Sequence, residues 1–172
     1  MLSRRAVETM KRRLGLSEDI ILIAQHNLAN TYNALGRHEE ALLMREEVYS
    51  GNLKLHGEED EITIMEANNY ASSLTELKCF DEAKALARKT QLVARRVLGD
   101  SADLTLRIRT MYAGALYEDP GATLDDLRES VTTLEDTAPI ARRVLGGAHP
   151  LTKEIEHYMQ ESRAALRARE TP

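Results

Sequence analysis

Residues 27–43 read NLANTYNALGRHEEALL and residues 69–85 read NYASSLTELKCFDEAKA, two stretches that share several landmarks at a separation of 42 residues. The shared positions are Asn27 and Asn69, Ala29 and Ala71, Leu35 and Leu77, Glu40 and Glu82, and Ala41 and Ala83. Pairs that end in glycine recur with spacings of 42, 42 and 47 residues at Leu14-Gly15, His56-Gly57, Leu98-Gly99 and Leu145-Gly146. Periods of this length are typical of stacked arrays, which present one continuous binding surface rather than a catalytic centre.

Each of the first two repeats is predicted to form two helices. In the first, apolar residues recur at intervals of three, four and seven, which predicts one apolar helix face over about 17–35. Ser17 suits the N-cap, and Gly36 suits the left-handed residue that ends a helix. A second helix is expected from near Glu39 to Gly57, and the next repeat copies the pair over 60–77 and 81–98. Small residues let the paired helices approach closely at Ala29, Ala41, Ala71 and Ala83.

The third repeat departs from this pattern. Its first helix is expected over about 102–118, because the sequence Asp119-Pro120-Gly121 is a strong turn signal. Thr123 is expected to cap the next helix together with Asp126, and this helix is expected to contain most of the five additional residues. Pro139 within the same helix predicts a kink or a break near residue 137. A last helix is predicted over about 150–169.

The predicted fold is an all-α, right-handed superhelical solenoid of antiparallel helix hairpins, with seven or eight helices in one domain. Its parts are expected at 1–15 (second helix of a partial repeat), 16–57 (repeat 1), 58–99 (repeat 2), 100–146 (irregular repeat 3) and 147–170 (first helix of a partial repeat). The basic residues near the start, among them Arg4, Arg5 and Lys11, also allow a targeting segment. The phase of residues 11–15 with 95–99 favours the helix of a partial repeat.

Composition excludes several classes of function. The chain of 172 residues has a net charge of −5, one Phe and no Trp, so nucleic acid is not an expected partner. No apolar run is long enough to enter a membrane, and the single Cys79 cannot form an internal disulfide, so an intracellular, cytoplasmic protein is the default expectation. The five histidines show no metal-ligand spacing, and no nucleophile and base converge. We therefore expect no cofactor, no metal and no enzymatic activity.

Several motifs resemble a known family. The spacing of Leu28, Ala29, Tyr32 and Ala41 resembles the tetratricopeptide repeat, a helix hairpin. Repeats of 42 residues with NNYA at 68–71, FDEAKAL at 80–86, ARRVLG at 94–99 and ARRVLGGAHPLT at 141–152 resemble its kinesin-light-chain-like subclass. The resemblance covers essentially the whole chain and implies a protein or peptide partner, bound by a scaffold or adaptor. It does not imply a motor.

The resemblance also implies where a ligand would bind. In the family, the first helix of each hairpin lines a concave groove that holds an extended peptide, and matching positions here predict contacts from His26, Asn27, Asn30, Asn69 and Arg107. The wider matching set is Ile23, Asn33, Met65, Asn68, Ser72, Glu76, Thr110, Met111, Gly114 and Glu118. Asparagine suits this role because its amide both donates and accepts hydrogen bonds. An extended, acidic peptide is the ligand considered. Met111 interrupts the family's clamp for a free C-terminal carboxylate, which makes that ligand a poor match.

Two alternatives remain open. Asn27 and Asn69 could brace neighbouring hairpins instead of binding a ligand. The chain could also be a structural subunit that packs through unpaired end helices into a larger assembly or a homo-oligomer. A dimer of that kind is expected to bury either Leu2, Ala6 and Met10, or Ile155, Tyr158 and Met159.

Overall fold

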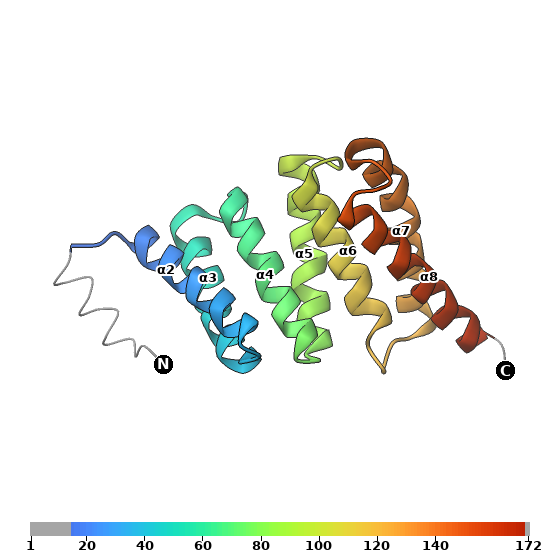
Figure 1. Ribbon diagram of the computed structural model, residues 1–172, viewed down its shortest axis with the longest axis horizontal. Coiled ribbons are helices and arrows are strands. Elements are labelled where there is room, and N and C mark those ends of the chain that lie inside the picture. Colours follow the sequence, from blue (N-terminus) through green and yellow to red (C-terminus); the bar gives the residue numbers. More distant parts are fainter. Residues whose placement is uncertain (1–14, 171–172) are drawn as a thin grey trace.

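The computed structural model describes residues 15–170, which form seven helices arranged as an elongated array (Figure 1). The helices are α2 (Glu18–Ala34), α3 (His38–His56), α4 (Glu61–Glu76), α5 (Phe80–Leu98), α6 (Asp103–Tyr117), α7 (Leu124–Leu145) and α8 (Pro150–Glu170). The predicted half-repeat helix at 1–15 and the basic N-terminal segment lie almost wholly outside the described residues.

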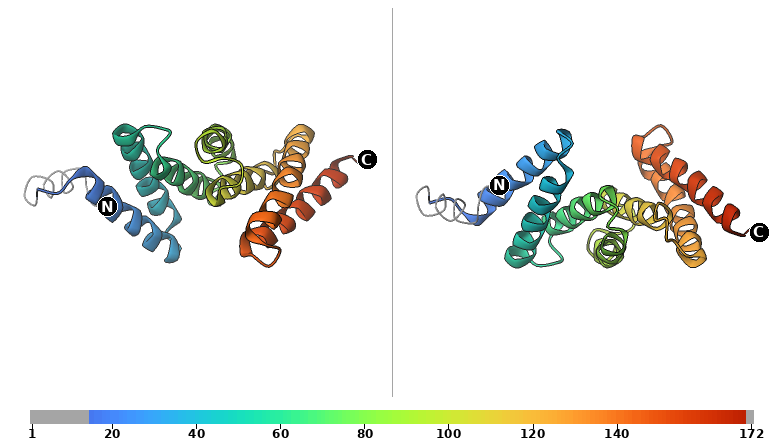
Figure 2. Two further views of the ribbon diagram at one scale, coloured as in Figure 1. Left: turned by 90° about the horizontal axis from the view of Figure 1, so that it is seen from above. Right: turned by 90° about the horizontal axis from the view of Figure 1, so that it is seen from below.

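The helices pack in chain order as antiparallel hairpins. Each helix contacts the next, so α2 pairs with α3, α4 with α5, α6 with α7, and α8 covers α7. The first helices of successive hairpins also touch, since α6 contacts both α4 and α8. Seen from above and below, α2 and α8 lie at opposite ends of the array (Figure 2). The predicted all-α class of stacked helix hairpins is confirmed.

Local sequence explains where the helices begin. Ser17 and Asp60 have extended backbones and accept hydrogen bonds from backbone N–H groups of the first turns of α2 and α4. Thr123 and Asp126 form the predicted reciprocal capping box at the start of α7, where the Asp126 N–H donates to Thr123 Oγ1 at 3.1 Å. Each such bond satisfies a donor that the helix itself leaves unpaired.

Small buried residues set the spacing within the hairpins. Ala29, Ala41, Ala71 and Ala83 are at most 1% exposed, as expected for positions where helices approach closely. Larger side chains fill the space between hairpins, and the densest core lies around α6, where Leu106 packs with Leu134 and Ile155. The third hairpin is therefore the best-buried part of the array.

One prediction about the third hairpin, a helix break near Thr137, was wrong. α7 continues without a break through Pro139, because the residues on either side of it, Ala138 and Ala141, are held in the core between α6 and α8. Buried apolar contacts thus outweigh the lost backbone hydrogen bond of the proline. The prediction that this helix contains most of the five additional residues is confirmed, because α7 is three residues longer than α5. The loop before it is also longer, while α6 is one residue shorter than α4. α7 has 22 residues against 19 in α3 and in α5, while the preceding loop spans 118–123 against 35–37 and 77–79.

One residue of the predicted dimer surface on the last helix is covered by the core of the chain itself. Ile155 is fully buried against α6 and α7, and Tyr158 and Met159 are partly buried against the same core. Ile155 is therefore not available to a second copy. The other predicted surface, at Leu2, Ala6 and Met10, lies outside the described residues.

Candidate functional site

Two of the predicted site residues contact one carboxylate, and a third contacts one of these two. The His26 Nδ1 lies 2.7 Å from Glu66 Oε1, and the Asn69 side-chain amide donates to Glu66 Oε2 at 3.3 Å. Asn30 donates its Nδ2 hydrogen to His26 Nε2 at 2.9 Å, which leaves the histidine Nδ1–H to face Glu66. Glu66 is 3% exposed, so this network of side chains is built on a buried carboxylate between α2 and α4.

A cation from α3 completes this network. Arg45 donates from Nη2 to Asn30 Oδ1 at 3.2 Å. Burial lowers the pKa of Arg45, while the nearby carboxylates of Glu76 and Glu66 act in the opposite direction. Buried polar groups are costly unless they are paired, so the chain of bonds from Arg45 to Glu66 ties the first hairpin to the second. His26, Asn30 and Asn69 are thus largely occupied by contacts within the chain.

The other two predicted residues lie apart from this network. Asn27 is exposed on α2, and its backbone carbonyl accepts the Thr31 hydroxyl at 2.9 Å. Arg107 lies on α6, where its Nε donates to Asp103 Oδ2 at 2.6 Å. The structure therefore does not gather the five predicted residues into a single site.

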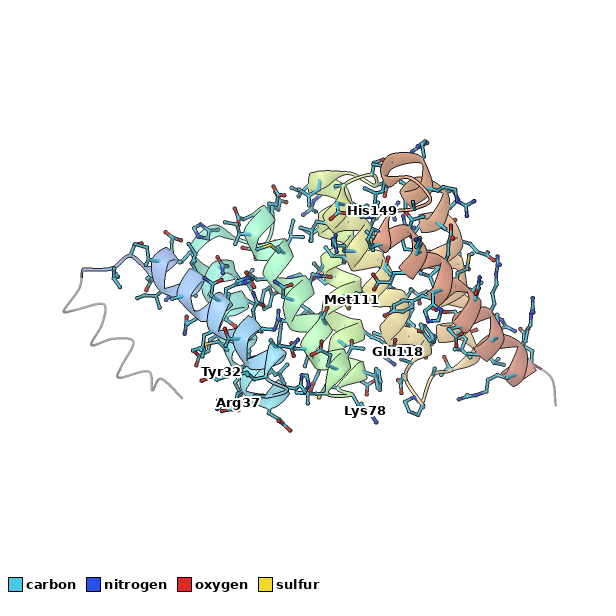
Figure 3. The ribbon with its side chains drawn as sticks, viewed as in Figure 1. Tyr32, Arg37, Lys78, Met111, Glu118 and His149 are labelled. Carbon is cyan, nitrogen blue, oxygen red and sulfur yellow. The ribbon has the colours of Figure 1, made fainter. Side chains whose placement is uncertain are left out.

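A pocket of about 340 Å³ opens between the first helices α4, α6 and α8. Asn68 and Ser72 of α4 line one side, Met111 and Gly114 of α6 form the middle, and Tyr158 of α8 lines the other side. Gly114 leaves room for the tyrosine, because a Cβ atom at that position would lie 3.1 Å from Tyr158 Cε2. Figure 3 shows Met111 and Glu118 along α6, with Glu118 nearer the loop that leads to α7.

The polar groups of this pocket are mainly acceptors. Glu76, Glu118 and Glu154 come from the α4, α6 and α8 segments, and the cation among the lining residues is Arg107. The Oδ1 atom of Asn68 is buried and has no hydrogen-bond donor. Partial burial raises the pKa of the Glu118 carboxyl, an effect that a hydrogen bond from Tyr117 opposes. Burial likewise raises the pKa of Tyr158, and Glu118 and Glu154 add to the shift.

A second, smaller pocket of about 190 Å³ lies between α2, α3 and α4. Its lining is mostly apolar and includes Ile23, Ile62 and Met65, which are 61%, 50% and 37% exposed. At its rim His56 Nε2 lies 2.8 Å from Asp19 Oδ1. The first-helix face, defined as the face formed by α2, α4, α6 and α8, thus carries an apolar hollow near one end and an acidic one further along.

Sequence reasoning missed several of these residues. Glu66 occupies the position that Ile108 holds one repeat later, so a carboxylate at an otherwise apolar position was the available signal. Glu154 and Tyr158 follow Arg107 and Met111 by 47 residues, the spacing of the last two repeats. Extending the matched positions into the last helix identifies both of them.

Metal sites and membrane-spanning helices were also considered for the described part of the chain. Within residues 15–170, no three His, Cys, Asp or Glu side chains gather as metal ligands. None of the helices described here combines the length and the apolar character that crossing a bilayer requires.

Comparison with known proteins agrees with the hairpin geometry. Residues 21–61, which run from α2 to the start of α4, match the tetratricopeptide repeat family. This segment of the chain is thus a tetratricopeptide repeat. Domains of this family are generally protein–protein interaction modules. A search of curated proteins found no match.

The solved structures that resemble this chain include proteins of the kinesin-light-chain type. Two crystal structures of nearly identical TPR-like repeats of a proposed kinesin light chain from Podosopora anserina align with TM-scores of 0.77 and 0.74, at 22% and 23% identity. Each alignment covers 96% of this chain and 76% of the other. The crystal structure of BtubC (BKLC) from P. vanneervenii aligns with a TM-score of 0.60 at 14% identity, covering 98% and 75% of the two chains. These likenesses establish a shared fold.

Proposed function

We propose that this protein is a non-catalytic adaptor that binds an extended segment of a partner protein across its first-helix face. The observation that carries the proposal is the pocket between α4, α6 and α8, which spans three successive first helices. Its lining includes the side chains of Asn68 and Ser72, which can hydrogen-bond to the backbone of a bound segment whatever its sequence. The general role of the repeat family in protein–protein interaction supports the same function.

The contacts that we assign differ from those first predicted. His26 and Asn69 contact Glu66, and Asn30 contacts His26, so their role in binding is to hold α2 and α4 in position. We assign direct contact with the bound segment to Asn68, Ser72 and the other residues that line the pocket. Arg107, which lines the pocket, and Asn27 on α2 also remain proposed contacts.

A bulky substitution inside the pocket tests this function. Ser72→Trp should fill the space between α4 and α6 and reduce retention of a displayed library of random dodecapeptides by roughly tenfold or more. Glu46→Trp is the matched control, because Glu46 is exposed on α3 outside the pocket. Both variants are compared with the parent protein by circular dichroism to confirm folding. Equal retention by all three proteins would contradict binding in this pocket.

The structural alternative has one observation in its favour. Ala138, Pro139 and Met159 line an open hollow between α7 and α8, next to the basic residues Arg142 and Arg163. Packing through this end would produce a stable oligomer whose mass is visible by light scattering. An oligomer combined with peptide retention that is insensitive to Ser72→Trp would favour the structural role over the adaptor.

A further inference from the structure

The α4–α6–α8 pocket has a surplus of negative charge. Its three carboxylates, on Glu76, Glu118 and Glu154, face the single guanidinium of Arg107. That guanidinium is already bound to Asp103 at 2.6 Å. The side chains of Arg107 and Asp103 are both about half exposed. Within residues 15–170, neither Glu118 nor Glu154 forms an ion pair with a cation. The positive charge of Arg107 is therefore largely neutralised before any ligand arrives.

Neighbouring groups add acceptors and a ring surface rather than cations. Asn68 Oδ1 is buried without a donor, and an unpaired buried acceptor is costly. Tyr158 lies edge-to-face with Tyr117, their ring centroids 5.5 Å apart. Tyr117 in turn lies in the field of Glu118 and Glu161. Rings beside carboxylates form an environment that favours a cation, because the ring faces are negative.

We propose that the α4–α6–α8 pocket receives the cationic side chain of an arginine or lysine in the bound partner segment. Glu118 and Glu154 would accept its N–H donors from opposite sides, and Asn68 Oδ1 would take a further one. This inference rests on the proposed function, since it names the chemistry of the segment that the adaptor binds. It also replaces the acidic peptide suggested by the sequence, because an acidic side chain would meet three like charges.

Five pools of peptides test this preference directly. Each pool contains N-acetylated, C-amidated nonapeptides with neutral flanking residues, and differs only in the central residue, which is Arg, Lys, Gln, Leu or Glu. Blocking the termini removes their charges, so the central side chain alone is compared. The pools are captured on the full chain at 0.15 M salt and quantified by mass spectrometry.

We expect the Arg and Lys pools to be retained roughly tenfold or more above the Glu pool, since hydrogen bonds between charged groups are the strong ones. The double variant Glu118→Gln with Glu154→Gln should remove this difference. The control double variant Glu39→Gln with Glu46→Gln changes the net charge of the chain equally, at exposed positions of α3. It should keep the difference, which separates a local site from a general attraction to an acidic protein.

The outcomes distinguish the two proposals. If the Gln and Leu pools are retained as well as the Arg and Lys pools, the proposal that the pocket binds a basic side chain is overturned. The proposed adaptor function is not affected by that result. An equal loss of the preference in both double variants would also overturn the proposal of a basic side chain, because general charge would then explain the result. If no pool is retained, the result contradicts both the adaptor function and the proposal that the pocket binds a basic side chain.

Discussion

The α2–α3 hairpin and the α6–α7 hairpin share one plan but differ in how deeply their first helix is buried. In α2 the one buried residue is Ala29, whereas α6 buries ten residues. α6 packs against α4, α5, α7 and α8, while the main contact of α2 within the described residues is α3. Both helices follow the same apolar pattern. Their different burial therefore indicates that the position of a helix in the stack, more than its sequence pattern, decides how much of it is buried.

The two hairpins also reverse the chain differently. The first turns within three residues, 35–37, around Gly36, and the second hairpin copies this turn at 77–79. The third uses the longer loop at 118–123, which neighbouring helices hold in place. Lys84 of α5 binds Asp119 at 2.8 Å, and Arg169 of α8 donates to the carbonyl oxygens of Pro120 and Ala122. A turn fixed by its own backbone is thus replaced by a loop fixed by distant side chains.

The largest expected effect tests the difference in burial. Leu22 and Leu106 occupy equivalent positions two repeats apart, but Leu106 is fully buried and Leu22 is only partly buried. Leu106→Ala should lower the free energy of unfolding by about 3 to 4 kcal/mol and Leu22→Ala by about 1 to 2 kcal/mol. Urea unfolding followed by circular dichroism measures both. Equal losses would mean that α2 is as well buried as α6.

A smaller effect is expected where the long loop is tied to α5. Lys84→Met should cost roughly 1 to 2 kcal/mol at neutral pH, because the Lys84–Asp119 pair is mostly buried. Arg128→Met is the control, since its pairs with Asp125 and Glu170 are exposed and should contribute little.

The same pair predicts a dependence on pH. Lys84 holds the pKa of Asp119 below its usual value, with help from the Gly121 N–H. A carboxyl whose pKa is lowered by folding stabilises the protein above its unfolded pKa of about 3.9, and this contribution is lost as pH falls through the folded value. The difference between the parent protein and Lys84→Met should therefore be greatest at neutral pH and shrink in acid. A constant difference down to pH 2 would show that the ion pair is not its source.

The smallest expected effect compares the two short turns. Gly36 has φ of 72° and Lys78 has φ of 61°, so a lysine occupies the left-handed conformation that glycine occupies one repeat earlier. Lys78→Gly should stabilise the protein by roughly 0.5 kcal/mol, and Gly36→Lys should destabilise it by about 1 kcal/mol. Thermal unfolding of the two single variants checks the sign of each change. Destabilisation by Lys78→Gly would show that the lysine side chain contributes contacts that outweigh its backbone cost.

These comparisons also show what the sequence could predict. The period, the caps at Ser17 and Thr123 and the glycine turn at Gly36 are local signals, and the structure confirms them. The unbroken α7 at Pro139 and the left-handed Lys78 were not predictable in this way, because packing between helices overrides local preference there.

The candidate site was less predictable for a related reason. Its pocket forms only where three first helices meet, and its surplus of carboxylates arises from side chains on all three of them. Matching to the family selected positions on each helix separately. It could not show that His26 and Asn69 would be occupied by Glu66, or Asn30 by His26 and Arg45.

The joints between hairpins have a consequence for the length of the molecule. Gly57, Gly99 and Gly146 close α3, α5 and α7 with φ of 85°, 86° and 88°, so the chain leaves each second helix in nearly the same direction. Residues 58–99 therefore form a unit that is preceded by Gly57 and ends at Gly99, two glycines with nearly the same backbone conformation. A second copy inserted after Gly99 would begin and end in a backbone conformation that already exists there, so the backbone at the joints would allow the array to be lengthened by one hairpin.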